Sequence, residues 1–364
     1  MTGHGIKAGL ALVTLFACSA PAQVRTQVDT VGFAVRWTDM EAVVAASLAA
    51  EDLIAPAAVD AAPCIAAILP HDDYLYAGRT AVHALPHLQA RRWVVIGVCH
   101  ACRRIGRRDK LLFDSYPAWR VAGREWPVDM DLRAALLERL VDWAEIDDER
   151  HAAEHSVESL LPWLGSAVDA PQFVPILVAG MELDTLRAAA DATASALADI
   201  CRERGWQPGR DLGILISADA VHYGCEGWGG GGYAPFGCDA TGHAAARQQD
   251  VTLAEATLTG LLDEHAIASF VRLVWDPTHP EYPDYPYRIT WCGLYSIPFG
   301  LTLARRWQAA LGGEPLTGSL LRYGDSVSDG RLDLPATSLG VTAPNTLAHW
   351  VGYPTLIYSA TSRR

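Results

Sequence analysis

The sequence predicts a single α/β domain with a central mixed, mostly parallel sheet flanked by helices. Short apolar segments alternate with longer segments of helical periodicity, which is the pattern of strand–helix–strand units. Four of the apolar segments have the composition of buried strands, at residues 64–69, 92–98, 172–178 and 212–217. A chain of 364 residues, half of them hydrophobic, is long enough to bury one large core or two smaller ones.

The segments between and after these strands predict the helices of the domain. Residues 183–204 form a long alanine-rich helix, and further helices are expected at 79–88, 131–143, 251–265 and 297–311. Final strands are expected at 320–323 and 355–358. No internal repeat or low-complexity linker divides the chain, so we expect one domain over residues 62–362.

Residues 23–61 precede this domain as an extension with one edge helix. Thr38-Asp39-Met40-Glu41 has the order of a capping box, which predicts a helix from there to about residue 50. A loop of small residues then leads into the first strand.

The first residues resemble an export signal. Lys7 precedes an apolar run that is too short to cross a bilayer. Ala20-Pro21-Ala22 fits a signal-peptidase site, whereas Leu15-Phe16-Ala17-Cys18 resembles a lipobox that would lipidate Cys18. We expect residues 1–22 to be a signal peptide, or a lipoprotein signal ending before Cys18. The protein is then periplasmic or extracellular, with a lipid anchor only in the second case.

The composition argues against two classes of partner. The formal net charge is −13 and no basic stripe is present, so a nucleic-acid-binding protein is not expected. Beyond the leader, no segment is long and apolar enough to cross a membrane. A small molecule or a peptide is the expected ligand.

Three histidines stand where predicted strands end. His71 follows Pro70, which cannot donate to a sheet ladder, and His100 follows the second strand. His222 follows the fourth strand, with Asp219 three residues before it. Ligands of open α/β sheets bind at the carboxyl ends of strands. The three positions therefore predict a shared cleft with functional histidines.

Two cysteines flank His100 as a C-x-x-C sequence, Cys99 and Cys102. A redox pair, half of a zinc site and two incidental thiols are all compatible with this spacing. A structural zinc site would need a second such pair at suitable spacing, and none follows. A disulfide is compatible with export. The role of the two cysteines stays open at this point.

His155 and Glu158 lie three residues apart, so they share a face if a helix starts there. One interpretation is a charged helix start, in which Glu154 and Glu158 favour the helix dipole. The other places His155 and a glutamate in the cleft, or behind a metal ligand.

An ordered set of motifs resembles the Memo family, whose bacterial members are called AmmeMemoRadiSam system protein B. The resemblance covers roughly residues 62–360. Its motifs are Pro70-His71-x-x-Tyr74-x-Tyr76-x-Gly78, Gly97-x-x-His100, Glu154-His155-Ser156-x-Glu158-x-x-Leu161-Pro162, Pro175-Ile176-Leu177-Val178, Ser217-x-Asp219-x-x-His222-x-Gly224 and Cys292-Gly293.

The resemblance implies both a fold and a site. The fold is that of a single α/β domain similar to the class III extradiol dioxygenases of the LigB type. His71, His100 and Cys292 correspond to the family's metal ligands, and one iron or copper ion is implied ahead of zinc. Asp219 and His222 correspond to the remaining cleft residues, which we interpret as catalytic together with His155. The family context also implies AMMECR-like and radical SAM proteins as partners.

The chain departs from the family in two places beside this site. Asp72 and Asp73 replace the usual Ala-Gly, and Leu294-Tyr295-Ser296-Ile297 replaces Arg-His-Pro-Ile. One of the two acids could join the metal ligands or lie behind them, as could Tyr74 and Glu158. Alternatively, the two acids cap the following helix or face solvent. Adjacent residues of an extended segment point in opposite directions, so at most one reaches the metal.

A glycine-rich insertion lies between Cys225 and His243. Cys225 and Cys238 bracket it, and we expect a disulfide between them, because a bridge across a glycine-rich loop reduces the entropy lost on folding.

These observations favour a metal-dependent redox enzyme, most concretely a non-haem iron or copper dioxygenase acting on a small aromatic substrate. Two histidines and one anionic ligand leave positions open at the metal, and a thiolate in place of a carboxylate favours copper. Two alternatives remain: a non-catalytic protein that binds a metal or a peptide in a vestigial cleft, and a zinc-dependent hydrolase.

Overall fold

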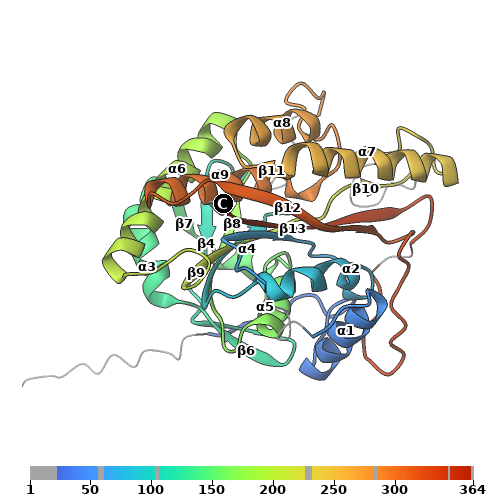
Figure 1. The fold of residues 1–364 in the computed structure, drawn as a ribbon, viewed down its shortest axis with the longest axis horizontal. Coiled ribbons are helices and arrows are strands. Elements are labelled where there is room, and N and C mark those ends of the chain that lie inside the picture. The colour runs from blue at the N-terminus through green and yellow to red at the C-terminus, as the bar shows by residue number, and fades with distance from the viewer. Residues whose placement is uncertain are drawn as a thin grey trace, which may run out of the picture.

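The computed structural model describes residues 23–55, 61–102, 106–225, 232–281, 286–342 and 345–361, so the expected leader lies outside the described residues. One large mixed sheet runs through this part of the chain, with helices on both faces (Figure 1). Its strand order is β11-β12-β13-β2-β9-β3-β8-β4-β7, and β10 pairs with β13 outside this path. This arrangement confirms the α/β fold class.

Parallel pairing is confined to part of the sheet. The central strands β2, β9, β3 and β8 are parallel, β13, β12 and β11 continue from β2 in antiparallel order, and β4 pairs antiparallel with β8 and parallel with β7. The strands of this sheet are β2 (Ala66–Leu69), β3 (Arg92–Val98), β4 (Leu111–Phe113), β7 (Ala144–Ile146), β8 (Gln172–Val178), β9 (Leu212–Ser217), β10 (His222–Tyr223), β11 (Gly260–Leu261), β12 (Leu316–Asp325) and β13 (Trp350–Ala360).

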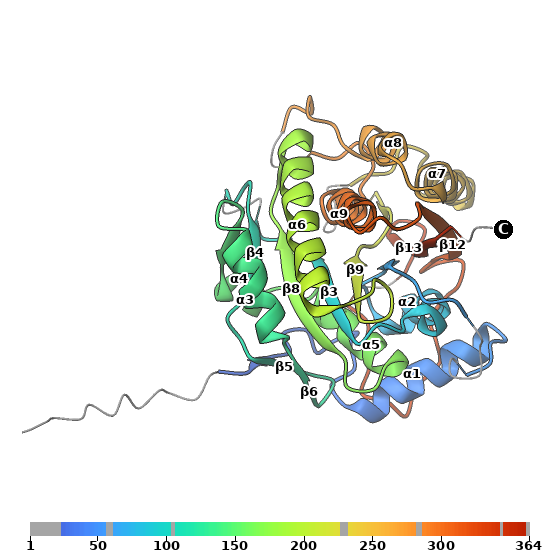
Figure 2. The same ribbon diagram turned by 60° about the vertical axis from the view of Figure 1, so that its left-hand side comes forward.

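The helices form two layers with separate cores. Helices α3, α6, α7, α8 and α9 pack on one face of the sheet, and α1, α2 and α5 pack on the other (Figure 2). No helix of the described residues has the length and apolar character needed to span a bilayer. The helices are α1 (Trp37–Ala50), α2 (Tyr74–Ala81), α3 (Met130–Arg139), α4 (Asp148–Ala152), α5 (Leu161–Ala167), α6 (Leu183–Arg204), α7 (Ala240–Leu258), α8 (Glu264–Val274) and α9 (Ser296–Ala310), with 3-10 turns η2 (Val82–His87), η3 (Glu158–Leu160) and η4 (Cys292–Leu294).

A row of isoleucines fixes the register of the four central strands. Ile68 lies beside Ile216, Ile216 beside Ile96, and Ile96 beside Ile176. All four side chains are fully buried in the core under α6 and α9. A shift by one residue would turn them to the opposite face, so the row strongly specifies the pairing. The same register places Leu69 beside Ser217 and brings the following residues together at one sheet edge.

A small second sheet was not expected from the sequence. It consists of β1 (Arg25–Thr26), β5 (Ala118–Val121) and β6 (Arg124–Pro127), with β5 in the middle. β1 runs parallel to β5 and comes from the N-terminal extension. A two-residue strand has no periodicity that a sequence pattern could reveal.

The prediction of one continuous helix over residues 251–265 is wrong. The chain there contains the end of α7, the short strand β11 and the start of α8. Gly260 adopts φ 74°, which a helix does not allow, and the Asp263 side chain accepts a hydrogen bond from the Ala266 N–H to begin α8. The apolar periodicity of α7 is weak, unlike that of α8, so the sequence pattern does not mark where α7 ends.

The prediction of a capping box at residues 38–41 is also wrong, although the helix predicted after it is present as α1. α1 begins at Trp37, with Arg36 in the capping position and no side-chain cap. The Asp39 carboxylate instead accepts hydrogen bonds from Arg36 and from the Ser338 hydroxyl. The helix expected at 79–88 begins earlier, as α2, and continues as the 3-10 turn η2 around Pro86.

The structure contains two disulfides, Cys99–Cys102 and Cys225–Cys238. The second is the bridge predicted around the glycine-rich insertion, of which residues 226–231 lie outside the described residues. Among the described residues, Cys64, Cys201 and Cys292 are buried free thiols.

Opening the Cys225–Cys238 bridge is expected to lower the free energy of unfolding by ~3 kcal/mol, because it closes a loop between residues 13 apart in the sequence. Equilibrium urea unfolding of the Cys225→Ala/Cys238→Ala protein measures this loss. The Cys99→Ala/Cys102→Ala protein is the matched control, because its bridge spans a separation of only 3 and should matter less. Wild-type stability in the first double variant would contradict the expectation.

Candidate metal centre

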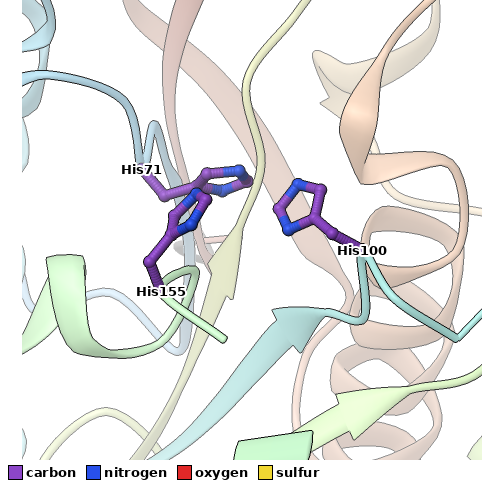
Figure 3. A group of neighbouring side chains, drawn as sticks. All are labelled: His71, His100 and His155. Atoms are coloured by element: carbon purple, nitrogen blue, oxygen red, sulfur yellow. The ribbon is translucent and has the colours of Figure 1, made fainter. Parts of the chain in front are cut away.

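Three histidines from three different loops converge at the carboxyl ends of the central strands (Figure 3). His71 follows β2, His100 follows β3, and His155 lies between α4 and η3. Their ring centroids are 5.0–5.5 Å apart. One ligand atom of each ring lies within 4.8 Å of the others, so the group could hold a metal ion. His71 is buried, His155 is half-buried and His100 is exposed, which leaves the site open on one side.

The ring of His71 is held in one tautomer by a serine. Its Nδ1 lies 2.8 Å from Ser217 Oγ, and that hydroxyl donates its only proton to the Ser156 carbonyl at 2.5 Å. Ser217 can therefore only accept from His71, so Nδ1 carries the proton and Nε2 keeps its lone pair. Burial, together with the nearby His100 ring, lowers the pKa of His71 well below its usual value, which keeps the ring neutral.

The ring of His100 is held by Glu154. Glu154 Oε1 lies 2.8 Å from His100 Nδ1, and Oε2 accepts the His100 backbone N–H at 2.9 Å. Burial alone would raise the pKa of this carboxyl, but the His100 ring and its hydrogen bond lower the pKa below the usual range. An ionised carboxylate can only accept, so His100 donates through Nδ1 and presents Nε2.

The ring of His155 is held by a residue of the N-terminal extension. Its Nδ1 lies 3.1 Å from Asp29 Oδ2. Burial favours the neutral ring, but the hydrogen bond to Asp29 and the charge of Glu154 outweigh it and raise the pKa of His155 to about 9. The metal-free ring is therefore cationic at neutral pH. To bind a metal, His155 would have to lose its Nε2 proton, and Nδ1 could remain bonded to Asp29.

All three rings thus share one arrangement. Each Nδ1 is engaged by a hydroxyl or a carboxylate, so Nε2 is the nitrogen of each ring that could bind an ion. Metal-binding histidines almost always have their second nitrogen held in this way, which fixes the ring and raises its basicity. The donor set therefore fits a metal ion.

A second possible ligand group lies deeper and shares His71. It combines His71 with Asp219 and Cys292, all three buried. His71 Nε2 lies 3.4 Å from Asp219 Oδ2 and 3.6 Å from Cys292 Sγ. Because Nε2 is the only free nitrogen of His71, the two groups cannot each bind an ion through it at once. Burial and the neighbouring acids raise the pKa values of Asp219 and Cys292 well above the usual range, so binding there releases protons.

Of the three residues expected to be catalytic, His155 and Asp219 each belong to one ligand group and His222 belongs to neither. Asp219 also accepts the His71 backbone N–H at 2.9 Å, which ties the His71 loop to the end of β9. His222 Nε2 lies 3.9 Å from Asp219 Oδ2. Burial lowers the pKa of His222 to about 4, so the ring is neutral at physiological pH.

Asp72 and Asp73 belong to neither ligand group found among the described residues. Asp72 Oδ2 accepts from the Tyr353 hydroxyl at 2.7 Å, and Asp73 Oδ2 accepts the Thr342 backbone N–H at 2.6 Å. Asp73 occupies the capping position of α2 by its backbone, without a side-chain cap. Burial, assisted by the charge of Asp72, raises the pKa of Asp73 to about 7. The expected capping and solvent-facing roles are therefore both wrong for Asp73.

Tyr74 and Glu158 also point away from the histidines. The Tyr74 hydroxyl donates to the Ser159 carbonyl at 2.7 Å. Glu158 is buried and forms an ion pair with Arg25. Both side chains hold the surrounding loops in place.

The sequence did not assign the groups that orient the three rings. Ser217, Ser156 and Glu154 stood within quoted motifs, and only their proximity to a histidine could have suggested a role. Asp29 had no local signal, because it lies 126 residues before His155 in the chain.

A small pocket with a cavity volume of about 30 Å³ adjoins the centre. This is room for one or two water molecules. The Cys99–Cys102 disulfide contributes to its wall. The residues lining it are Val98, Cys99, His100, Cys102, Val178, Gly180, Tyr287, Cys292, Tyr295 and Ser296.

The fold and these ligand groups define an α/β protein with a candidate metal centre at the carboxyl ends of its central strands. A model of the Memo-like protein family matches residues 47–326, which is most of the chain. The chain belongs to the Memo-like family.

Curated relatives match over shorter stretches. A MEMO1 family protein of Methanothermobacter thermautotrophicus is 28% identical over 158 residues, covering 43% of this chain and 53% of the relative. One of Methanosarcina acetivorans is 30% identical over 159 residues, covering 43% and 54%. The chain spans about half the length of the curated relatives it matches. Among solved structures, an uncharacterized protein of Escherichia coli K12 matches with a TM-score of 0.36 and 15% identity, over 79% of this chain and 98% of that one.

Replacing His71 by Ala is expected to abolish stoichiometric metal binding, because His71 is the residue common to both ligand groups. Elemental analysis of protein purified without chelator measures the metal content. His155→Ala and Cys292→Ala distinguish the groups. Metal loss in His155→Ala but not in Cys292→Ala protein assigns the ion to the three histidines. Metal loss in Cys292→Ala but not in His155→Ala protein assigns it to the deeper group. Full occupancy in His71→Ala protein would refute a centre built on this residue.

Proposed function

We propose that this protein is a metal-dependent, dioxygenase-like oxidoreductase that acts on a small aromatic substrate. The observation that carries the proposal is the cluster of three histidine rings, each with its Nδ1 engaged so that its Nε2 could bind an ion. One iron or copper ion is proposed, held by His71 with His100 and His155, or by the deeper group of His71, Asp219 and Cys292. The set expected from the family resemblance, His71, His100 and Cys292, is not one of the groups found among the described residues. Such an ion would supply the oxygen chemistry.

The roles proposed for the protein groups follow from their positions. Ser217, Glu154 and Asp29 fix the rings, so the nitrogens need little rearrangement when an ion enters. Asp219 lies between the His71 and His222 rings, at 3.4 and 3.9 Å from their Nε2 atoms. With its raised pKa, Asp219 can hold a proton beside a neutral His222. We propose that this pair exchanges a proton with the substrate.

The walls of the adjoining pocket, rather than its volume, support an aromatic substrate. The pocket lies between His100 and Cys292 and includes the side chains of Tyr287 and Tyr295. Ring-shaped substrates pack well against such aromatic walls, and the exposed position of His100 leaves access from solvent.

A zinc-dependent hydrolase is the second candidate, because three histidines with an open position are also the ligand set of catalytic zinc sites. Zinc would supply an activated water molecule. In that case, the Asp219–His222 pair would handle the proton of that water.

Metal content and oxygen uptake separate these functions. Protein purified without chelator is expected to contain one equivalent of iron or copper and to consume O₂ when catechols are added. Removal of the metal with a chelator should stop the uptake, and adding back the metal should restore it. Zinc with ester hydrolysis and no uptake would favour the second candidate. Tight metal binding without either reaction would refute an enzyme of these two classes and favour a metal- or peptide-binding protein.

We further propose that the protein is exported. The leader-like sequence and the two disulfides support this proposal, because disulfides persist in oxidising compartments. Mass spectrometry of the mature protein should find an N-terminus near Gln23, or a lipidated Cys18. An intact Met1 on protein recovered from the cytoplasm would contradict export. AMMECR-like and radical SAM proteins are proposed as partners, and the family context alone supports this proposal.

A further inference from the structure

The segment before α1 contacts the loops of two of the three histidines, His155 and His71. This segment, residues 25–34, is called the N-terminal strap below. It includes β1 and runs across the side of the site where His155 lies. Sequence patterns place it outside the α/β core, yet its contacts lead directly to the candidate metal centre.

Buried charges anchor the strap at its first residue. Arg25 is 2% exposed and forms an ion pair with the buried Glu158. Its Nη2 donates to the Glu154 carbonyl at 2.6 Å, and its guanidinium lies 4.1 Å from the centre of the Trp119 ring. A buried charge left without its partner is strongly destabilising, so this end of the strap cannot leave the protein without a large cost.

Glu158 also fixes the strap further along. Its carboxylate accepts the backbone N–H of Val28 at 3.0 Å and that of Asp29 at 2.9 Å. The backbone of Asp29 is therefore held before its side chain reaches His155. This explains why Glu158 is buried three residues after His155 although it does not face the cleft.

The strap then contacts the residues around His155 and the His71 loop. Asp29 Oδ2 lies 3.1 Å from His155 Nδ1, and the Phe33 ring centre lies 5.9 Å from that of His155. The Gly32 carbonyl accepts the Tyr74 N–H at 2.9 Å, three residues after His71. Gly32 has φ 81°, and a Cβ there would overlap the Asp73 side chain, so the strap follows one close path.

The solvent exposure of the Asp29–His155 pair argues that the pair contributes little to protein stability. The Asp29 and His155 side chains are 41% and 32% exposed, and ion pairs at such positions contribute little to stability. Stability is not the relevant quantity for a histidine that binds a metal. A group that holds Nδ1 typically changes metal affinity or activity by about 10–100-fold through the orientation and basicity of the ring.

We propose that Asp29 is a positioning residue for the metal centre and that the N-terminal strap holds Asp29 in place beside His155. Glu158 and Arg25 fix the strap, Asp29 orients the His155 ring, and Nε2 of His155 is thereby presented beside His71 and His100. The inference rests on the proposed metal-dependent function. It makes the N-terminal extension a part of the site rather than an appendage.

Cobalt(II) binding tests this role without reference to turnover. Asp29→Asn and Asp29→Ala should weaken cobalt(II) binding about 10–100-fold and change its visible ligand-field spectrum, whereas Asp29→Glu should recover part of both. Asp184→Asn is the matched control, because Asp184 is 96% exposed on α6 and does not contact the centre. Thermal unfolding of the metal-free proteins should be the same in all of them, since an exposed pair adds little stability.

The outcomes separate the inference from the proposed function. Equal affinity and an unchanged spectrum in Asp29→Asn and Asp29→Ala would overturn the role of Asp29 alone. Normal cobalt(II) results with no oxygen uptake by the iron- or copper-loaded protein would overturn the proposed oxidoreductase and leave the role of Asp29 intact. A wild-type protein that binds no cobalt(II) would overturn both.

Discussion

The pairing of four parallel strands is the constraint on which the rest of the structure depends. Buried isoleucines at the same level of β2, β9, β3 and β8 fix this pairing, since a one-residue slip would turn each of them out of its core. Leu69 and Ser217 then lie side by side at the ends of β2 and β9. Two residues after Leu69 comes His71, whose ring meets the Ser217 hydroxyl. The tautomer of a cleft histidine therefore follows from the packing of a hydrophobic core.

Buried charged groups with their partners hold the His155 segment against the carboxyl ends of the central strands. Glu154 and Glu158 lie four residues apart on either side of His155, and both are buried. Arg25 neutralises the second of them, while the His100 ring and two backbone amides satisfy the first. Neither carboxylate could remain ionised in the interior without these partners. The segment that carries His155 is therefore held in part by the N-terminal extension docked against it.

The sequence revealed those parts of the site that depend on local signals. His71 and His100 follow short apolar strands directly, so their position at the sheet edge could be predicted, and so could the strands themselves. Cys292 became a candidate only through the family resemblance, because no local pattern links it to β2 or β9. Asp29 and Arg25 could not be found, since their contacts join segments more than 120 residues apart. The break at Gly260 was missed because the apolar pattern of α7 is too weak to mark the end of that helix.

The two ligand groups share one nitrogen, His71 Nε2, so an ion bound there can use only one of the two groups. Imidazole nitrogens suit iron, zinc and copper alike, whereas a thiolate selects softer ions such as copper(I). His71 Nε2 belongs to both groups, and it can bond to one ion at a time. An ion at this nitrogen must therefore draw its other ligands from the exposed side, where His100 and His155 lie, or from the buried side with Asp219 and Cys292. The buried side requires two further protons to leave a region of low dielectric, and the exposed side has its rings oriented beforehand. Glu154 and Asp29 of the N-terminal strap hold the outer two rings, so they favour the exposed group over the buried one.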